Sequence, residues 1–256
     1  MHTWILLRGL TRESRHWGDF VGQFQQALPD HRVVTLDLAG NGLLNQQSSP
    51  IRVQQMMAAC RLQLAQRQIQ PPCHLLAMSL GAMVAVAWAQ SHPHEVSALV
   101  LINTSMRPWS PFYQRLLPAN YGRLLSLMLS GAAPQAWERA ILHMTSNRGD
   151  ESVLPDWLAW RLANPVSRLN ALRQLLAAAR FRAAPHPPLA PTLLLASLQD
   201  HLVSLQCSTT LARHWSCSLR MHPTAGHDIP LDDGPWVVAQ VQEWLSQRSG
   251  GQPLGG

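Results

Sequence analysis

Residues 73–89 read CHLLAMSLGAMVAVAWA, and this stretch decides the fold. It opens with an apolar run, Cys73–Met78, which lacks the polar alternation of a half-exposed strand and is typical of a strand buried on both faces. Ser79 follows directly, with the small residues Ala77 and Gly81 two positions away on either side. Small residues at these positions suit a sharp turn from strand to helix, and the apolar residues beyond Ser79 predict a buried helix.

The alternation of apolar runs and helical segments continues on both sides of this stretch. Five further runs predict strands at residues 4–7, 32–38, 96–102, 192–196 and 218–221. Helices are predicted at residues 16–28, 53–67 and 236–247. Strands and helices that alternate in this way predict the α/β class, with a mostly parallel sheet flanked by helices.

One long segment interrupts this alternation. Residues 106–190 contain no convincing strand, and prolines divide them into about four helical segments. We therefore expect an inserted all-helical cap, or lid, between the two parts of one α/β core, residues 1–105 and 191–248. The Gly-rich end of the chain, residues 249–256, is expected to be a flexible tail.

The charge of the chain is unevenly distributed. All 20 basic residues are arginines, and the absence of lysine excludes Schiff-base chemistry, pyridoxal-phosphate attachment and a P-loop. Residues 106–190 contain ten arginines and four acidic residues, so they carry the whole net charge of +6. This surface is either a solvated helix face or a site for an acidic protein or an anionic substrate. No known nucleic-acid-binding motif is present, so no nucleic-acid partner is expected.

Cysteine usage and hydropathy bear on cofactors and on location. The four cysteines, Cys60, Cys73, Cys207 and Cys217, lack a metal-ligand spacing, so we expect reduced, buried thiols. Neither a metal nor another cofactor is expected. The chain has no apolar run near the ~20 residues of a membrane span and no secretory signal at its N-terminus. These features predict a cytoplasmic protein without a membrane span.

Polar residues that follow the predicted strands are candidates for chemistry, because ligands bind beyond the carboxyl ends of parallel strands. Ser79, Asp200 and His227 each lie in such a place. A serine nucleophile needs a base to take its proton, and the base needs a carboxylate to orient it, so the three residues predict a catalytic triad. Alone, Ser79 could also cap the following helix. The backbone N–H groups of Leu10 and Leu80 are the predicted oxyanion hole.

At these residues the sequence resembles the α/β-hydrolase family, over nearly its whole length. The segments that carry the likeness are Arg8-Gly9-Leu10, residues 36–42 (LDLAGNG), the turn around Ser79, the Asp200 turn and Gly226-His227-Asp228. The resemblance implies the same triad and oxyanion donors, and a core sheet with a helical cap before the Asp200 strand. Arg8 departs from the family pattern, because histidine usually occupies its place in the oxyanion loop.

The chain looks like the compact microbial esterases of this family, and its basic cap is similar to that of the pimeloyl-carrier-protein methyl ester esterases. In those proteins cap arginines meet an acidic acyl carrier protein. The predicted function is a serine carboxylic ester hydrolase that acts on short to medium acyl esters through an acyl-enzyme intermediate. The alternatives are a pimeloyl-[acyl-carrier protein] methyl ester esterase, a lyase or C–C hydrolase of the same fold, and a non-catalytic binding module.

Large apolar side chains are expected to line the substrate pocket, to pack the cap onto the core, or to do both. They are Met78, Trp109, Phe112, Tyr113, Trp157 and Trp160. Trp157 and Trp160 stand three residues apart and would share one helix face.

Overall fold

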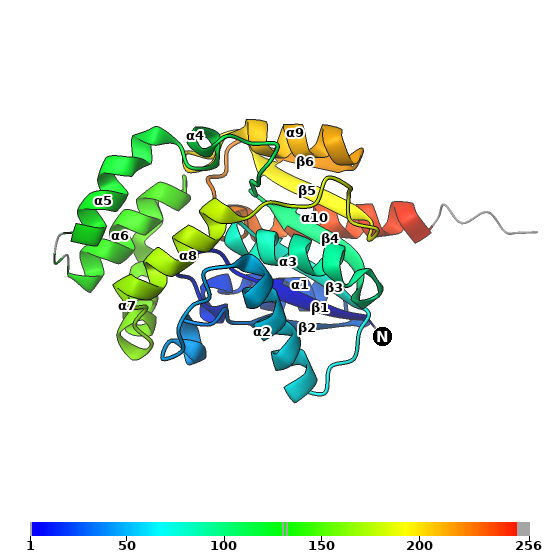
Figure 1. The fold of residues 1–256 in the computed structure, drawn as a ribbon, viewed down its shortest axis with the longest axis horizontal. Coiled ribbons are helices and arrows are strands. Elements are labelled where there is room, and N and C mark those ends of the chain that lie inside the picture. The colour runs from blue at the N-terminus through cyan, green and yellow to red at the C-terminus, as the bar shows by residue number, and fades with distance from the viewer. Residues whose placement is uncertain (1, 130, 132, 250–256) are drawn as a thin grey trace, which may run out of the picture.

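The computed structural model describes residues 2–129, 131 and 133–249. In these residues six parallel strands form one sheet with the order β2-β1-β3-β4-β5-β6 (Figure 1). The strands are β1 (His2–Leu7), β2 (His31–Leu36), β3 (Cys73–Met78), β4 (Val96–Ile102), β5 (Thr192–Ser197) and β6 (Ser218–His222). The predicted α/β class and parallel sheet are confirmed.

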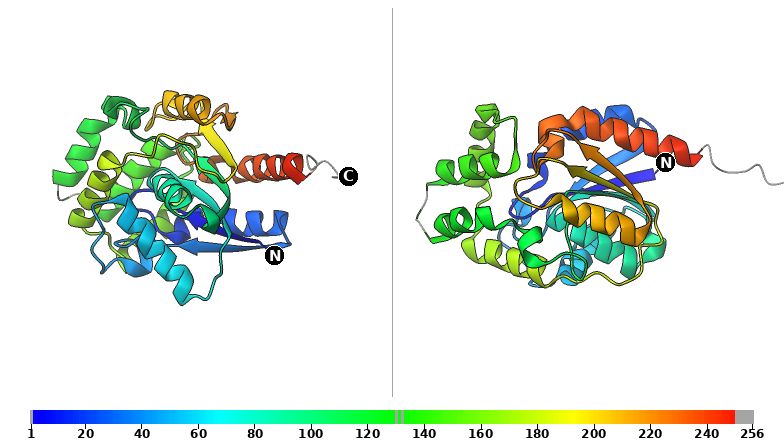
Figure 2. Two further views of the ribbon diagram at one scale, coloured as in Figure 1. Left: turned by 45° about the vertical axis from the view of Figure 1, so that its right-hand side comes forward. Right: turned by 90° about the horizontal axis from the view of Figure 1, so that it is seen from above.

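Helices cover both faces of the sheet, as Figures 1 and 2 show. The helices of the core are α1 (Phe20–Ala27), α2 (Val53–Gln66), α3 (Leu80–Ser91), α9 (Leu205–Trp215) and α10 (Ile229–Ser249). Apolar residues of α2, α3 and α9 form one buried layer against the sheet, and those of α1 and α10 form the layer on the other face. Strands between two apolar layers must be apolar on both faces, which explains the unbroken runs in the sequence.

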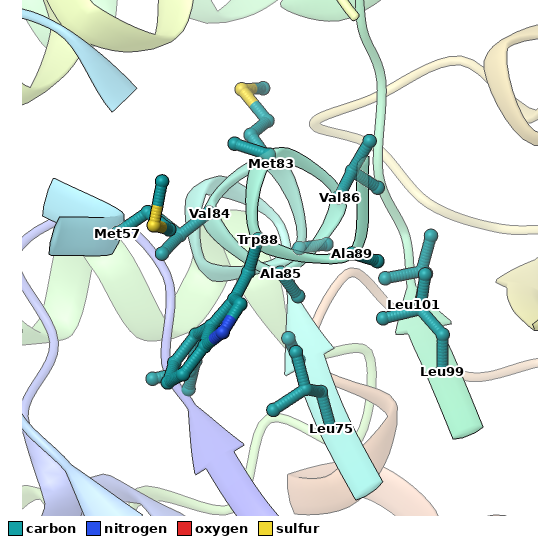
Figure 3. Packing of buried hydrophobic residues seen from close by; sticks show 14 of the residues in the cluster. Met57, Leu75, Met83, Val84, Ala85, Val86, Trp88, Ala89, Leu99 and Leu101 are labelled. Carbon is teal, nitrogen blue, oxygen red and sulfur yellow. The ribbon is translucent and has the colours of Figure 1, made fainter. Parts of the chain in front are cut away.

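Helix α3 lies at the centre of the first layer (Figure 3). Each residue from 80 to 89 is buried, and Trp88 points from α3 toward the sheet, where Leu75 of β3 and Leu99 of β4 lie. The helix packs on both of these strands. Since α3 is held on all sides, the residue between β3 and α3 is fixed at the carboxyl edge of the sheet.

Two predicted helices have different bounds in the structure. The first, expected over residues 16–28, is divided into a 3-10 turn, Ser14–Trp17, and α1, with Gly18 at φ +51° between them. The last begins at Ile229 and has a break at Asp233, where φ is −153°. The Asp233 carboxylate accepts the Trp236 N–H at 3.1 Å and so caps the part that was predicted.

The segment between β4 and β5 is helical, and we call residues 106–190 the helical insertion. Its helices are α4 (Phe112–Arg115), α5 (Tyr121–Leu129), α6 (Pro134–Thr145), α7 (Leu154–Ala163) and α8 (Arg168–Arg180). In Figure 1 α5, α6 and α7 lie beyond one end of the sheet, and α8 runs back along α3. The described residues also form short 3-10 helices at Gly42–Leu44, Pro93–Glu95, Pro118–Asn120 and Glu151–Val153.

Two predictions concern the ends and the hydropathy of the chain. The predicted tail, residues 249–256, lies outside the described residues except for Ser249, which ends α10. Among the described helices, none is both long enough and apolar enough to cross a membrane.

Candidate active site

Ser79 occupies a strained turn between β3 and α3. Its backbone has φ +52° and ψ −118°, a conformation that is uncommon for a residue with a Cβ atom. The Ser79 N–H donates to the carbonyl of Ile102 at 3.0 Å, which ties the turn to the end of β4. Within the described chain the Ser79 side chain makes no capping hydrogen bond to α3. The helix-cap alternative for this serine therefore has no support in the geometry.

Two glycines leave room for the turn. A Cβ atom on Gly81 would lie 2.5 Å from the carbonyl oxygens of both Leu7 and Arg8. A Cβ atom on Gly9 would lie 3.2 Å from the Cβ of Ser79. Both distances are too short for ordinary van der Waals contact, so the loop that follows β1 packs directly against the serine turn.

Asp200 and His227 form a hydrogen-bonded pair beyond the ends of β5 and β6. Nδ1 of His227 lies 2.7 Å from Oδ2 of Asp200, and the two side chains are only 4% and 2% exposed. The other carboxylate oxygen accepts the backbone N–H groups of Leu202 and Val203 at 2.8 and 2.9 Å. An ionised carboxylate can only accept hydrogen bonds, so Nδ1 of His227 carries a proton and Nε2 of the neutral ring is an acceptor.

The surroundings of His227 shift its pKa in opposing directions. Burial lowers the pKa of His227, but the charge and the hydrogen bond of Asp200 outweigh burial, so the pKa lies above its ordinary value. The charge of Asp228 also raises this pKa, whereas the charge of Arg8 lowers it. A histidine in this setting is stabilised when it takes up a proton, which is what a general base requires.

The rule that polar residues after strands are candidates also applies to Asn103, which was not predicted. Asn103 is the first residue after β4 and has φ +44°. Its Nδ2 donates to the carbonyl of His227 at 2.8 Å, and its Oδ1 accepts the N–H of Ser197 at 2.9 Å. Asn103 therefore ties the histidine loop to the end of β5.

Ser79 and His227 line one cavity, with a volume of about 150 Å³. Leu10 and Leu80 line the same cavity, and in the described part of the chain their N–H groups donate to no protein acceptor. Apolar side chains of the core and of the insertion form most of the remaining wall: Met83, Leu116, Leu124, Ile141, Met144, Leu175, Leu202 and Val203. The cavity thus combines a serine, a histidine and two unpaired N–H donors, the set that acyl transfer requires.

Two of the residues predicted to bind substrate, Met78 and Phe112, line this cavity or the groove beside it. Met78 lines the cavity itself. Phe112 is 74% exposed and lines an adjoining groove, which shares Met83 and Leu116 with the cavity. Tyr113 is 49% exposed and lines neither space. Substrate binding by these residues stays a prediction.

The three predicted tryptophans lie elsewhere among the described residues. Trp109 packs edge-on against Trp215 of α9, with ring centroids 5.6 Å apart. Trp157 and Trp160 both contact the His16 ring, at 5.4 and 5.2 Å, so they do share one face of α7. None of the three lines the Ser79 cavity as the described residues form it, and packing between the insertion and the core is the role that their contacts support.

Arg8, whose place in the oxyanion loop differs from the family pattern, has a partner that the sequence analysis missed. Its Nη1 donates to Oδ1 of Asp228 at 3.1 Å, and its Nη2 donates to Oδ2. The two side chains are 2% and 4% exposed, and the guanidinium lies 4.8 Å from the ring centroid of Trp17. Since 220 positions separate Arg8 from Asp228, local sequence patterns carry no signal for this pair.

The described residues contain no group of three or more His, Cys, Asp or Glu side chains placed to hold a metal ion. All four cysteines are free, and three of them are buried. Burial raises the pKa of Cys60 to about 12 and that of Cys73 to about 11. These two thiols are therefore protonated at neutral pH and are poor nucleophiles.

Comparisons with known proteins agree with this fold. The family described as "Serine aminopeptidase, S33" matches residues 2–234. A pimeloyl-[acyl-carrier protein] methyl ester esterase of Aeromonas hydrophila is 30% identical to this chain, over 78% of this chain and 77% of that protein. A candidate carbamate hydrolase, RutD, of Variovorax paradoxus is 28% identical, over 96% of this chain and 92% of that protein.

A solved structure gives the same result for the fold alone. The crystal structure of a candidate non-heme bromoperoxidase, BpoC, of Mycobacterium tuberculosis is similar with a TM-score of 0.77 and 20% identity, over 96% of this chain and 92% of that chain. The family match extends over nearly all of the sheet and its helices. The chain therefore belongs to the family described as "Serine aminopeptidase, S33" and is an α/β-hydrolase.

Proposed function

We propose that the protein is a serine carboxylic ester hydrolase that acts on short to medium acyl esters. One observation carries the proposal: Ser79 on its strained turn and His227, paired with Asp200 at 2.7 Å, line the same cavity. The esterase from Aeromonas hydrophila supports the reaction class. The predominantly apolar wall suits an acyl chain.

In this reaction the Ser79 hydroxyl attacks the ester carbonyl carbon while Nε2 of His227 takes the hydroxyl proton. Asp200 keeps the imidazole in the required tautomer and stabilises the imidazolium ion. The Leu10 and Leu80 N–H groups bind the oxyanion that forms. His227 then gives its proton to the leaving alcohol, and a water molecule, activated by the same nitrogen, releases the acid from Ser79.

The helical insertion would act as the lid of this site. It supplies part of the cavity wall, from Leu116 and Leu124 to Met144 and Leu175. A cover that turns apolar side chains toward the cavity excludes water from the acyl enzyme and limits the length of the acyl chain that fits.

The first experiment measures hydrolysis of p-nitrophenyl esters from acetate to dodecanoate by the wild type and by Ser79→Ala. We expect activity that falls by at least about 1,000-fold in Ser79→Ala, because the variant lacks the hydroxyl that forms the acyl enzyme in the proposed reaction. Ser105→Ala is the matched control, since Ser105 lines the same cavity without a partner in the proposed reaction. Its activity should stay within about threefold of the wild type.

A serine-directed phosphonate probe separates the remaining outcomes. Labelling of Ser79 in a protein that hydrolyses none of the test esters would indicate a hydrolase or lyase with a more selective substrate. An unlabelled, inactive wild type would contradict the proposal and favour a non-catalytic binding module. Ester hydrolysis that survives in Ser79→Ala would also contradict it.

A narrower candidate is pimeloyl-[acyl-carrier protein] methyl ester esterase. The relative that bears this name and the charge of the insertion both favour it. In the described residues several insertion arginines form no ion pair with an acidic side chain: Arg107, Arg123, Arg180 and Arg182. All four are exposed, so a carrier protein of negative charge could approach them.

Charge reversal tests this candidate. Arg123→Glu and Arg180→Glu should raise KM for a methyl ester on the carrier protein by about tenfold or more and leave p-nitrophenyl acetate hydrolysis unchanged. Higher salt should weaken the wild-type preference in the same way. Equal KM values in the wild type and in the charge-reversed variants would exclude carrier docking at these arginines.

A further inference from the structure

A buried ion pair joins the two loops that meet at the candidate active site. Arg8 follows β1 directly and lies two positions before Leu10, whose N–H is a proposed oxyanion donor. Asp228 follows His227 directly. The Arg8 guanidinium donates to both carboxylate oxygens of Asp228, and both side chains are almost fully buried. The pair therefore ties the oxyanion loop to the loop of the proposed base.

Further contacts fix both partners of this pair. The Arg8 guanidinium lies over the Trp17 ring. The backbone carbonyl oxygen of Arg8 lies close to α3 at Gly81. The Asp228 N–H donates to the carbonyl of Thr145 at 2.7 Å, at the end of α6. A shift of either partner would therefore move the serine turn, the histidine loop or the insertion.

We propose that Arg8 and Asp228 are positioning residues for the hydrolase reaction, which hold the Leu10 N–H and the His227 imidazole in register with Ser79 and cancel each other's charge beside His227. This inference rests on the proposed function of Ser79 and His227. Neither residue takes part in bond making or breaking.

Stability alone gives no reason for charges at this place. The free energy lost when two ions leave water offsets much of the attraction between them. Two apolar side chains of similar volume would stabilise the fold at least as well. The bidentate geometry does something that apolar packing does not, because two parallel hydrogen bonds fix both distance and angle between the loops. A catalytic geometry requires this precision, since small displacements of oxyanion donors reduce the rate steeply.

Among the described residues, the charges that act on the pKa of His227 are those of Asp200, Asp228 and Arg8, which lie on three different loops. Asp200 follows β5, Asp228 lies on the histidine loop, and Arg8 follows β1. Asp200 is hydrogen-bonded to the ring, and the other two carry opposite charges whose effects on His227 oppose each other. Without Arg8, the buried anion of Asp228 would favour the imidazolium ion and raise the pKa of His227. Without Asp228, the cation of Arg8 would lower the pKa of His227.

The test compares Arg8→Met, Asp228→Asn and the double variant in the pH dependence of kcat/KM for a p-nitrophenyl ester. The acid limb reports the protonation of the base. We expect it to move up by about one pH unit in Arg8→Met and down by about one unit in Asp228→Asn. In the double variant it should return to within about 0.3 unit of the wild type, because both charges are gone.

Rate constants test the positioning role separately. In all three variants kcat should fall by about 10- to 100-fold with KM within about threefold of the wild type, since the oxyanion loop loses its tie. Arg8→Lys keeps the charge but lacks the fork, so it should show the fall in kcat without the pH displacement. Arg61→Met, which breaks a bidentate pair with Glu95 remote from the cavity, is the matched control and should change neither quantity.

Single variants that move the acid limb in the same direction, or not at all, would overturn the proposal. A readout without substrate covers the case in which the wild type hydrolyses no ester, and it also applies if a variant has lost activity. The pKa of the His227 imidazole, followed by NMR in each folded variant, should move in the same opposite directions. A flat NMR result would overturn the inference, and opposite shifts in a protein without esterase activity would refute only the proposed reaction.

Discussion

The α/β core and the helical insertion are held together by different kinds of interaction. In the core, strands and helices bury two continuous apolar layers, one on each face of the sheet. The insertion has a small apolar cluster of its own, centred on Leu142, Leu154 and Trp157. Several of its leucines face outward, among them Leu129 and Leu162, which are 73% and 63% exposed. The core is thus stabilised mainly by apolar burial, and the insertion much less so.

Buried polar contacts add to apolar packing where the insertion meets the core, since Ala177 and Phe181 of the insertion belong to one apolar layer of the core. Glu138 of α6 accepts hydrogen bonds from Arg12, in the loop after β1, and from Arg161 of α7. Gln174 of α8 is completely buried and bonds the same loop. Ser146, after α6, donates to Asp232 of the core at 2.5 Å. Polar contacts are directional, so this joint fixes the place of the insertion while adding less stability than an apolar interface of equal area.

The largest loss of stability is expected at the buried ion pair between the insertion and the core. Glu138→Gln keeps the shape of the side chain but leaves Arg12, only 8% exposed, as a buried cation that has lost its hydrogen-bonded counter-charge. Breaking a buried pair in this way costs about 3–5 kcal/mol. Because the core does not depend on the pair, the loss should appear as opening of the insertion. Hydrogen exchange and limited proteolysis should increase in α6 and α7 before global unfolding in urea.

Glu151→Gln provides the matched control for this variant, because it makes the same change within the insertion. Glu151 pairs with Arg139 at 3.2 Å, and both side chains are about half exposed at 46% and 47%. An exposed pair contributes less than about 1 kcal/mol, so exchange in α6 and α7 should stay at the wild-type level. Equal effects of the two substitutions would show that the buried pair does not hold the insertion.

The core was largely predictable from sequence because apolar patterns report burial directly. The bounds of β3 and β4 were predicted to the residue, and the buried helix expected beyond Ser79 is α3. The place of Ser79 followed from small neighbours and a strand-to-helix change, both local features. Asp200 and His227 followed from a rule about strand ends, and their contact at 2.7 Å agrees with it.

The joint was not predictable, since its contacts connect residues that are far apart in sequence. Arg12 and Glu138 are separated by 126 positions, and the same limit applies within the core to Arg8 and Asp228, which are separated by 220. A single arginine or glutamate on a helix has the same local pattern whether it is buried or solvated. Trp157 illustrates the limit, because its side chain packs under the Arg12 guanidinium at 4.1 Å and does not line the Ser79 cavity of the described residues.

The next largest change in stability is expected in the core, where α3 passes close to the end of β1. In Gly81→Ala the new Cβ meets two backbone carbonyl oxygens at 2.5 Å, so α3 must move away from the end of β1. Overpacking of this kind costs up to about 3 kcal/mol. Gly22→Ala in α1, where nothing lies within 4 Å, should instead stabilise by about 0.5–1 kcal/mol through helix propensity. Urea denaturation measures both, and equal signs would contradict the close approach of α3 to β1.

The smallest loss of stability is expected at the uncharged hydrogen bonds between the insertion and the core. Gln174 accepts the Thr11 N–H at 2.8 Å and donates to Asn41 at 2.7 Å and Ser49 at 3.0 Å. Gln174→Leu leaves the Thr11 N–H and the Asn41 Oδ1 atom without this buried partner, at a cost of about 2 kcal/mol in the free energy of unfolding. Gln135→Leu, on the exposed side of α6, should change it by less than about 0.5 kcal/mol. Because Thr11 adjoins Leu10, Gln174→Leu should also lower kcat for ester hydrolysis, and an unchanged kcat would separate the joint from the oxyanion loop.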